Sequence, residues 1–170
     1  MGTKRVGWAR IRSLINENQN QLQTRYRKVI TNTGTETLTE AQSGAIITTT
    51  GAGARTITLP SAAAGLEYQF YFTDTFTGTL IIQAASSADT FQGALFQLDK
   101  DEAGAVVALN ENIDTAGWNV PAAADYILTM NADTDGRFLG GTVTFTAVNA
   151  SKWLVSGTVF GDGTVSHNFS

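Results

Sequence analysis

A few short groups of residues have the types and spacing that catalysis could use. Ser166 and His167 follow Asp162, and the three side chains are those of a hydrolase triad. On a terminal strand, however, residues 166 and 167 would point to opposite faces, which is unsuited to proton transfer from serine to histidine. His167 is the only histidine and the chain has no cysteine, so multi-histidine and cysteine-based metal sites are excluded. We expect His167 to be an edge or surface residue.

A second group resembles the opening of a calcium-binding loop. Residues 131–136 offer oxygen ligands at the first, third and fifth positions and a glycine at the sixth. The twelfth position is Thr142, which cannot supply the bidentate carboxylate that completes such a loop. A polar turn is the simpler interpretation, and calcium stays the alternative.

Two further kinds of site find little support. The run at 51–53 has the first two glycines of a phosphate-binding loop but lacks the third glycine and a following helix. Carboxylate pairs for glycoside hydrolysis could still come from distant strands, although acids are common throughout residues 29–170. We therefore predict no catalytic residue, no cofactor-binding residue and no metal ligand, and expect a protein that is not an enzyme.

The distribution of charge is more informative. The whole chain has a net charge of −4, but residues 1–28 carry +6 and residues 29–170 carry −10. Basic and large apolar side chains alternate in the N-terminal segment, and these are the candidate anchoring residues: Lys4, Arg5, Trp8, Arg10, Ile11, Arg12, Leu14, Ile15, Arg25, Tyr26, Arg27 and Lys28. Apolar side chains of this kind can be buried against a partner while guanidinium groups pair with carboxylates or phosphates. Because the acidic remainder would oppose nucleic acid, we expect a protein partner. A solvated N-terminus is the alternative.

The apolar residues of this basic segment have helical spacing. One helix face would carry Trp8, Ile11, Ile15, Leu22 and Val29, with Asn18 and Arg25 interrupting it. A helix this short is marginal in water unless its apolar face docks on another surface. The pattern leaves two alternatives, a docked helix or an extended arm.

From residue 31 onward, apolar and polar residues alternate, which is typical of strands that bury one face. The alternation predicts strands at 56–59, 66–73, 142–148 and 152–160, and shorter buried strands at 45–47, 80–82, 105–109 and 126–130. Glycine and Asx residues between them predict hairpin turns. We expect an all-β fold, an antiparallel β-sandwich or jelly-roll-like barrel, with a basic N-terminal arm. The expected organisation is an anchoring arm at 1–30 and a β-domain at 31–170.

No apolar run approaches the roughly 18 residues of a membrane span. The basic N-terminus also lacks the apolar core and cleavage site of a signal peptide. We expect a protein that is made in a cytoplasm and has no membrane partner.

Several short runs follow one another in a distinctive order along residues 35–170. The most specific are Thr56-Ile57-Thr58-Leu59-Pro60, Ala64-Gly65-Leu66-Glu67-Tyr68-Gln69-Phe70 and Lys152-Trp153-Leu154-Val155-Ser156-Gly157. This order resembles small β-rich virion proteins of tailed bacteriophages. That group includes capsid decoration (cement) proteins and the β-domains of head or tail fibres.

The resemblance implies a homotrimer on the outer surface of a phage capsid that stabilises contacts between subunits of the major capsid protein. The N-terminal arm would grip the shell, with Trp8, Ile11, Leu14 and Ile15 as apolar anchors and the flanking arginines as charge partners. The chain has no long repetitive shaft, which favours the cement function over a fibre. A head- or tail-fibre module that binds a host receptor or carbohydrate is the alternative.

Overall fold

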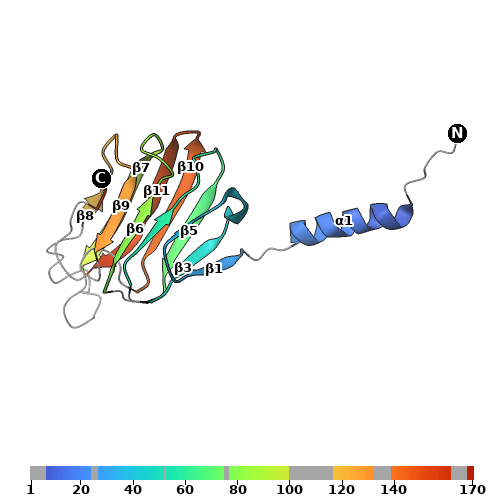
Figure 1. Ribbon diagram of the computed structural model, residues 1–170, viewed down its shortest axis with the longest axis horizontal. Coiled ribbons are helices and arrows are strands. Elements are labelled where there is room, and N and C mark those ends of the chain that lie inside the picture. The colour runs from blue at the N-terminus through green and yellow to red at the C-terminus, as the bar shows by residue number, and fades with distance from the viewer. Residues whose placement is uncertain are drawn as a thin grey trace.

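Two β-sheets form the body of the protein, and a helix projects from it (Figure 1). The computed structural model describes residues 7–23, 27–51, 53–74, 77–99, 117–131, 139–161 and 168–170. Sheet A has seven strands in the order β1-β3-β5-β10-β11-β7-β8, and sheet B has four in the order β2-β4-β6-β9. The strands of sheet A are β1 (Val29–Asn32), β3 (Ile46–Thr49), β5 (Glu67–Phe72), β7 (Thr90–Asp99), β8 (Gly117–Asn119), β10 (Thr142–Asn149) and β11 (Lys152–Gly161). Those of sheet B are β2 (Glu36–Thr37), β4 (Arg55–Thr58), β6 (Thr79–Gln83) and β9 (Ile127–Asn131). A short 3-10 helix, η1 (Glu40–Gln42), precedes β3.

The alternating residues of both sheets meet in one hydrophobic core. Phe70 and Phe145 of sheet A pack edge to face with their ring centroids 5.7 Å apart. Ile57 and Leu128 of sheet B belong to the same fully buried cluster. The polar residues between them face outward and are threonine-rich, as on β10, because a strand turns successive side chains to opposite faces. The alternation thus explains why these segments form strands and which side of each is buried.

Through its first six strands the chain crosses from one sheet to the other at every step. Strands β1, β3 and β5 lie in sheet A, whereas β2, β4 and β6 lie in sheet B. Each strand therefore meets its neighbour in the same sheet only after a full turn of the chain, and the two run in the same direction. The pairs β1–β3, β3–β5, β2–β4 and β4–β6 are all parallel.

The structure confirms that the fold is rich in β-strands, but the predicted antiparallel arrangement is wrong, because both sheets are mixed. Sheet A contains the antiparallel pairs β5–β10 and β10–β11 beside the parallel pair β7–β11. The physical reason lies in the connections. Gly51, predicted to lie in a hairpin turn, has φ +89° and lies between β3 of sheet A and β4 of sheet B. Glycine permits positive φ in a hairpin and in a corner between sheets alike, so the turn residues do not reveal which strands pair.

The strands expected at 45–47, 56–59, 66–73, 80–82, 126–130, 142–148 and 152–160 correspond to described strands within a few residues. The strand expected at 105–109 lies outside the described residues. Strand β7 is not among the expected strands, because Gly93 and the buried polar Gln97 interrupt its alternation. Val29, expected on a helix face, instead begins β1.

Two buried polar side chains hold connections against the core. The Arg55 guanidinium donates to the backbone carbonyls of Asn32, over 2.9 Å, and of Gly51, over 2.7 Å. Burial lowers the pKa of Arg55. The Tyr68 hydroxyl donates to the Thr39 carbonyl over 2.8 Å, and burial raises the pKa of Tyr68 to about 12. Both side chains therefore tie the backbone of a distant segment to the core.

Candidate binding arm

The described part of the basic arm is a helix, α1 (Trp8–Gln23). Gly7 comes directly before it, and the Gly7 carbonyl accepts a hydrogen bond from the Arg10 N–H over 2.9 Å. Glycine offers no side chain to cap the helix, and α1 has neither an acidic residue in its first turn nor a basic residue in its last. The local sequence therefore does little to stabilise α1, so its helicity depends on what covers its apolar face.

The large apolar side chains in the first half of α1 are uncovered. Trp8 is 75% exposed, Leu14 54%, Ile15 47% and Ile11 38%. Figure 1 shows α1 extending away from both sheets, so the β-body does not cover these residues. Of the two alternatives left by the sequence, the arm is helical from 8 to 23, but it is not docked on its own body. Large exposed apolar side chains gathered on one helix are typical of surfaces that bind another molecule.

Two of the predicted anchoring arginines belong to the same helix. Arg10 and Arg12 lie on α1 and are both exposed. At 100° per residue, they flank the direction of Ile11 on opposite sides. An apolar strip bordered by guanidinium groups can bury its centre against a partner while its margins pair with carboxylates.

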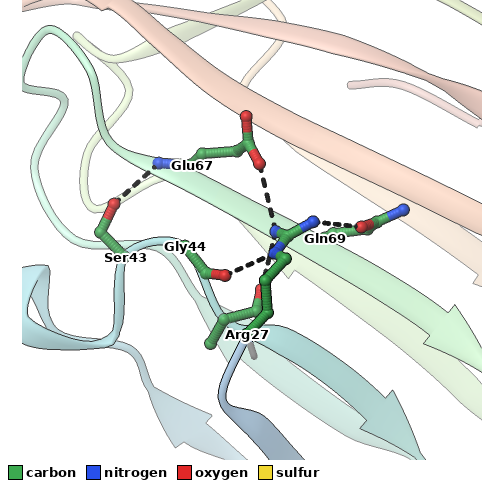
Figure 2. A network of polar contacts seen from close by, with 6 residues as sticks. Arg27, Ser43, Gly44, Glu67 and Gln69 are labelled. Atoms are coloured by element: carbon green, nitrogen blue, oxygen red, sulfur yellow. Dashed lines mark hydrogen bonds and ion pairs between the residues drawn. The ribbon is translucent and has the colours of Figure 1, made fainter. Parts of the chain in front are cut away.

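Arg27 has a different place from the candidate anchoring residues of α1. Figure 2 shows its guanidinium against the body at the root of the arm. It donates to the Gly44 carbonyl over 2.7 Å, to the Gln69 Oε1 over 2.6 Å and to the Ala45 carbonyl over 3.5 Å. It also forms an ion pair with Glu67 at 3.1 Å. We call this group the Arg27 clamp. It fixes the arm to β5 and to the entry of β3, so Arg27 acts within the chain.

Sheet A begins inside residues 1–30, the segment that the sequence assigns to the anchoring arm. The Lys28 carbonyl accepts a hydrogen bond from the Ile46 N–H over 2.8 Å, and Val29 opens β1. Four of the candidate anchoring residues lie outside the described residues, namely Lys4, Arg5, Arg25 and Tyr26. The candidate calcium ligands at 133 and 135 and the candidate triad at 162–167 also lie outside them.

Replacing Arg27 by alanine is expected to lower the free energy of unfolding by about 1–2 kcal/mol. The change removes four hydrogen bonds of one guanidinium, but the Arg27 and Glu67 side chains are 38% and 43% exposed, so solvent weakens their ion pair. Urea denaturation measures the effect. Arg10→Ala is the matched control, because Arg10 is an exposed residue of α1, and it should change stability by less than about 0.5 kcal/mol. Equal effects of the two substitutions would contradict the clamp.

The structure also reveals an aromatic pair that the sequence did not indicate. Trp118 on the edge strand β8 is 67% exposed, and its ring centroid lies 5.1 Å from that of Phe96 on β7. The two residues are far apart in sequence, and only the β7–β8 pairing brings them together. A tryptophan exposed to this degree can bind a ligand through its ring face.

Within the described ranges, no group of three or more histidine, cysteine, aspartate or glutamate side chains could hold a metal ion. Nor is any helix of the described chain long and apolar enough to span a membrane. In comparisons with known proteins, no family model, no curated protein and no solved structure matches this chain.

Proposed function

We propose that this protein is a structural virion protein that binds the outer surface of a phage capsid and stabilises the contacts between its subunits. The proposal combines the resemblance of residues 35–170 to phage virion proteins with one structural observation. That observation is a helix that projects from an acidic β-body, leaves the apolar and basic side chains of its first half exposed, and is followed by Arg27, which is fixed to the body. No chemistry is required of such a protein, and its partner is the major capsid protein.

Stabilisation of the capsid would follow from linkage. A protein that contacts several subunits at once binds only the assembled shell, and its binding free energy therefore opposes disassembly. In a homotrimer, three arms would bind as one multivalent ligand, so modest contacts per arm would add to a high overall affinity. The arm and the body carry opposite charges, so an acidic shell surface would attract the arm and keep the body outward.

The double substitution Arg10→Gln and Arg12→Gln is expected to weaken capsid binding at least tenfold. Both guanidinium groups are exposed on α1 and are free to pair with carboxylates of the shell, where several arms repeat each lost contact. Co-sedimentation of the full-length protein with capsids over a concentration series measures the affinity. The effect should decrease at high salt, because surface charge pairs are screened.

The matched control is Ser87→Glu with Ala88→Glu, which changes the net charge by the same amount. Both residues are exposed in the connection between β6 and β7, far from the arm in sequence. This control should bind capsids like the unchanged protein. If the control and the arginine variant lose affinity equally, binding depends on net charge alone and the arm is not the anchor.

A fibre module that binds carbohydrate is the second candidate, and the exposed Trp118 beside Phe96 favours it. Sugar rings present apolar C–H faces that pack on an indole ring, and loop or edge residues supply hydrogen bonds. Glycan-array binding that is lost in Trp118→Ala, together with no affinity for capsids, would establish this function over the first. If the Trp118→Ala variant still binds capsids, the result supports the decoration function and not the fibre function.

A further inference from the structure

The apolar residues of α1 follow the spacing of a coiled coil. Trp8, Ile11 and Ile15 are separated by three and four residues, and Leu22 lies seven residues beyond Ile15. Asn18 fills the position between them, which completes the alternating steps of three and four that define the a and d positions of heptads. We call these five residues the α1 seam. Its side chains from 8 to 15 are exposed, and no strand of the described body covers them.

An uncovered helix of this kind needs a partner to stay folded. At 16 residues, α1 is close to the length at which isolated helices are marginal in water. Gly7 offers no side-chain cap at its N-terminus, and α1 has no acidic residue in its first turn and no basic residue in its last, so charged side chains do not offset the helix dipole. Its stability must therefore come from burial of the seam.

We take the partner to be the same helix of other copies. Anchors three, four and seven residues apart also suit a helix that lies in a groove, but steps of three and four that continue to Leu22 match a second seam of the same kind. No charged residue occurs in the seam, so identical helices would not repel one another there. Isoleucine at one a position, Ile15, and at one d position, Ile11, favours more than two helices, and Leu14 beside them widens the apolar face.

A parallel arrangement in register suits identical helices. It brings the same seam position of every copy into one layer, so each layer pairs like with like. Parallel helices also place all the bodies at the same end, since each α1 is followed by the Arg27 clamp.

We propose that α1 helices from several copies of this chain pack in parallel through the α1 seam and form a short bundle. This association goes beyond capsid attachment and requires no capsid. In this bundle Trp8, Ile11 and Ile15 contact the same residues of other copies, while Arg10 stays on the outside. The bundle would present the arginines of several arms together, which is the condition for multivalent binding.

The absence of cysteine from the chain allows a direct test by disulfide formation. Ile11→Cys places a thiol in the seam, where identical residues of parallel helices approach within the distance that a disulfide spans. Ser13→Cys, two residues away on the same helix, places a thiol on the side opposite the seam. After mild oxidation of the full-length proteins, non-reducing electrophoresis should show covalent dimers of Ile11→Cys at least tenfold above those of Ser13→Cys. Equal yields, or no dimer of either, would overturn the proposal.

A second experiment measures mass and helicity without a crosslink. Sedimentation equilibrium of the unchanged protein should give the mass of several chains. Ile11→Lys with Ile15→Lys introduces charge into the seam and should reduce both that mass and the helical signal in circular dichroism. Ala9→Lys with Ser13→Lys adds the same charge outside the seam and should change neither. The bodies could also hold the copies together, so that the mass of the seam variant stays the same. In that case a loss of helicity in the seam variant, and not in the control, supports the bundle.

The proposal fails if the unchanged protein is a single chain, or if the seam variant retains its mass and its helicity. Its failure is separable from that of the capsid function. A single-chain protein that still binds capsids, and loses binding in the seam variant, would place the seam against the shell. If the bundle forms but the protein binds no capsid, the contact between α1 helices is supported and the decoration function is wrong.

Discussion

Gly157→Ala is expected to lower the free energy of unfolding by about 3 kcal/mol or more, one of the two largest effects predicted for this chain. Gly157 lies on β11 and pairs with Val143 of β10 inside sheet A. Its φ is +153°, and a Cβ added there would lie 2.1 Å from the Thr142 carbonyl oxygen. Because that contact is with backbone, β10 and β11 must separate to accommodate a methyl group, at the cost of their hydrogen bonds.

Urea denaturation followed by tryptophan fluorescence measures this effect. Gly34→Ala is the control, because Gly34 is exposed, has no positive φ and has open space where the alanine methyl group would lie. It should change stability by less than about 0.5 kcal/mol. A loss of similar size in the two variants would contradict the close approach of β10 and β11.

Trp153→Ala is expected to lower the free energy of unfolding by about 4 kcal/mol. Trp153 is fully buried, is among the largest side chains of the core, and packs against Tyr68 with the ring centroids 5.9 Å apart. Its removal leaves a cavity in the core beside Tyr68 that neighbouring side chains fill only in part, so the lost burial of the indole and the cavity itself both lower stability.

Trp153→Phe is the matched comparison for this site. The Trp153 Nε1 is buried and has no hydrogen-bond partner among the described residues, so phenylalanine removes a polar group whose burial is unfavourable. Its smaller volume should cost about 1–2 kcal/mol, well below the cost of alanine. Equal losses for alanine and phenylalanine would show that the indole N–H contributes to stability through a partner.

These two stability effects also separate folding from binding. Gly157 and Trp153 lie inside sheet A, whereas the seam and the arginines of α1 lie outside the body. A change in the core should weaken capsid binding only in proportion to the fraction of protein that unfolds. A change on α1 should weaken binding while the unfolding of the body stays the same. Measuring both quantities for each variant therefore assigns a loss of binding to the arm or to the fold.

Much of the local structure could be predicted from the sequence, because local structure follows from residue order alone. Alternation at 142–148 placed Val143 and Phe145 on a buried face, and both are fully buried in the structure. The spacing of Trp8, Ile11 and Ile15 predicted helical geometry, and these residues lie in α1. The change from +6 to −10 separated the arm from the body within a few residues of the start of sheet A.

The candidate site could be predicted only in part. Arg10, Arg12 and the apolar residues from Trp8 to Ile15 are exposed as a binding surface requires, but whether they bind a capsid stays a prediction. Arg27 looked like the other basic residues of the arm, because nothing near it in sequence indicates its partners. Glu67 and Gln69 are 40 and 42 residues away, and the chain must fold before they surround its guanidinium.

The sequence by itself determined seven of the eleven described strands, which face of the alternating strands is buried, and where the charge changes sign. Each of these depends on neighbours a few residues apart, whose side chains and backbone angles impose a period of two or of 3.6. Only the tertiary structure decided which strands pair, in which direction, and which distant side chains meet, as Phe96 and Trp118 do. The reason is that a corner between two sheets and a hairpin use the same glycine geometry, so the choice between them rests on packing across the whole core.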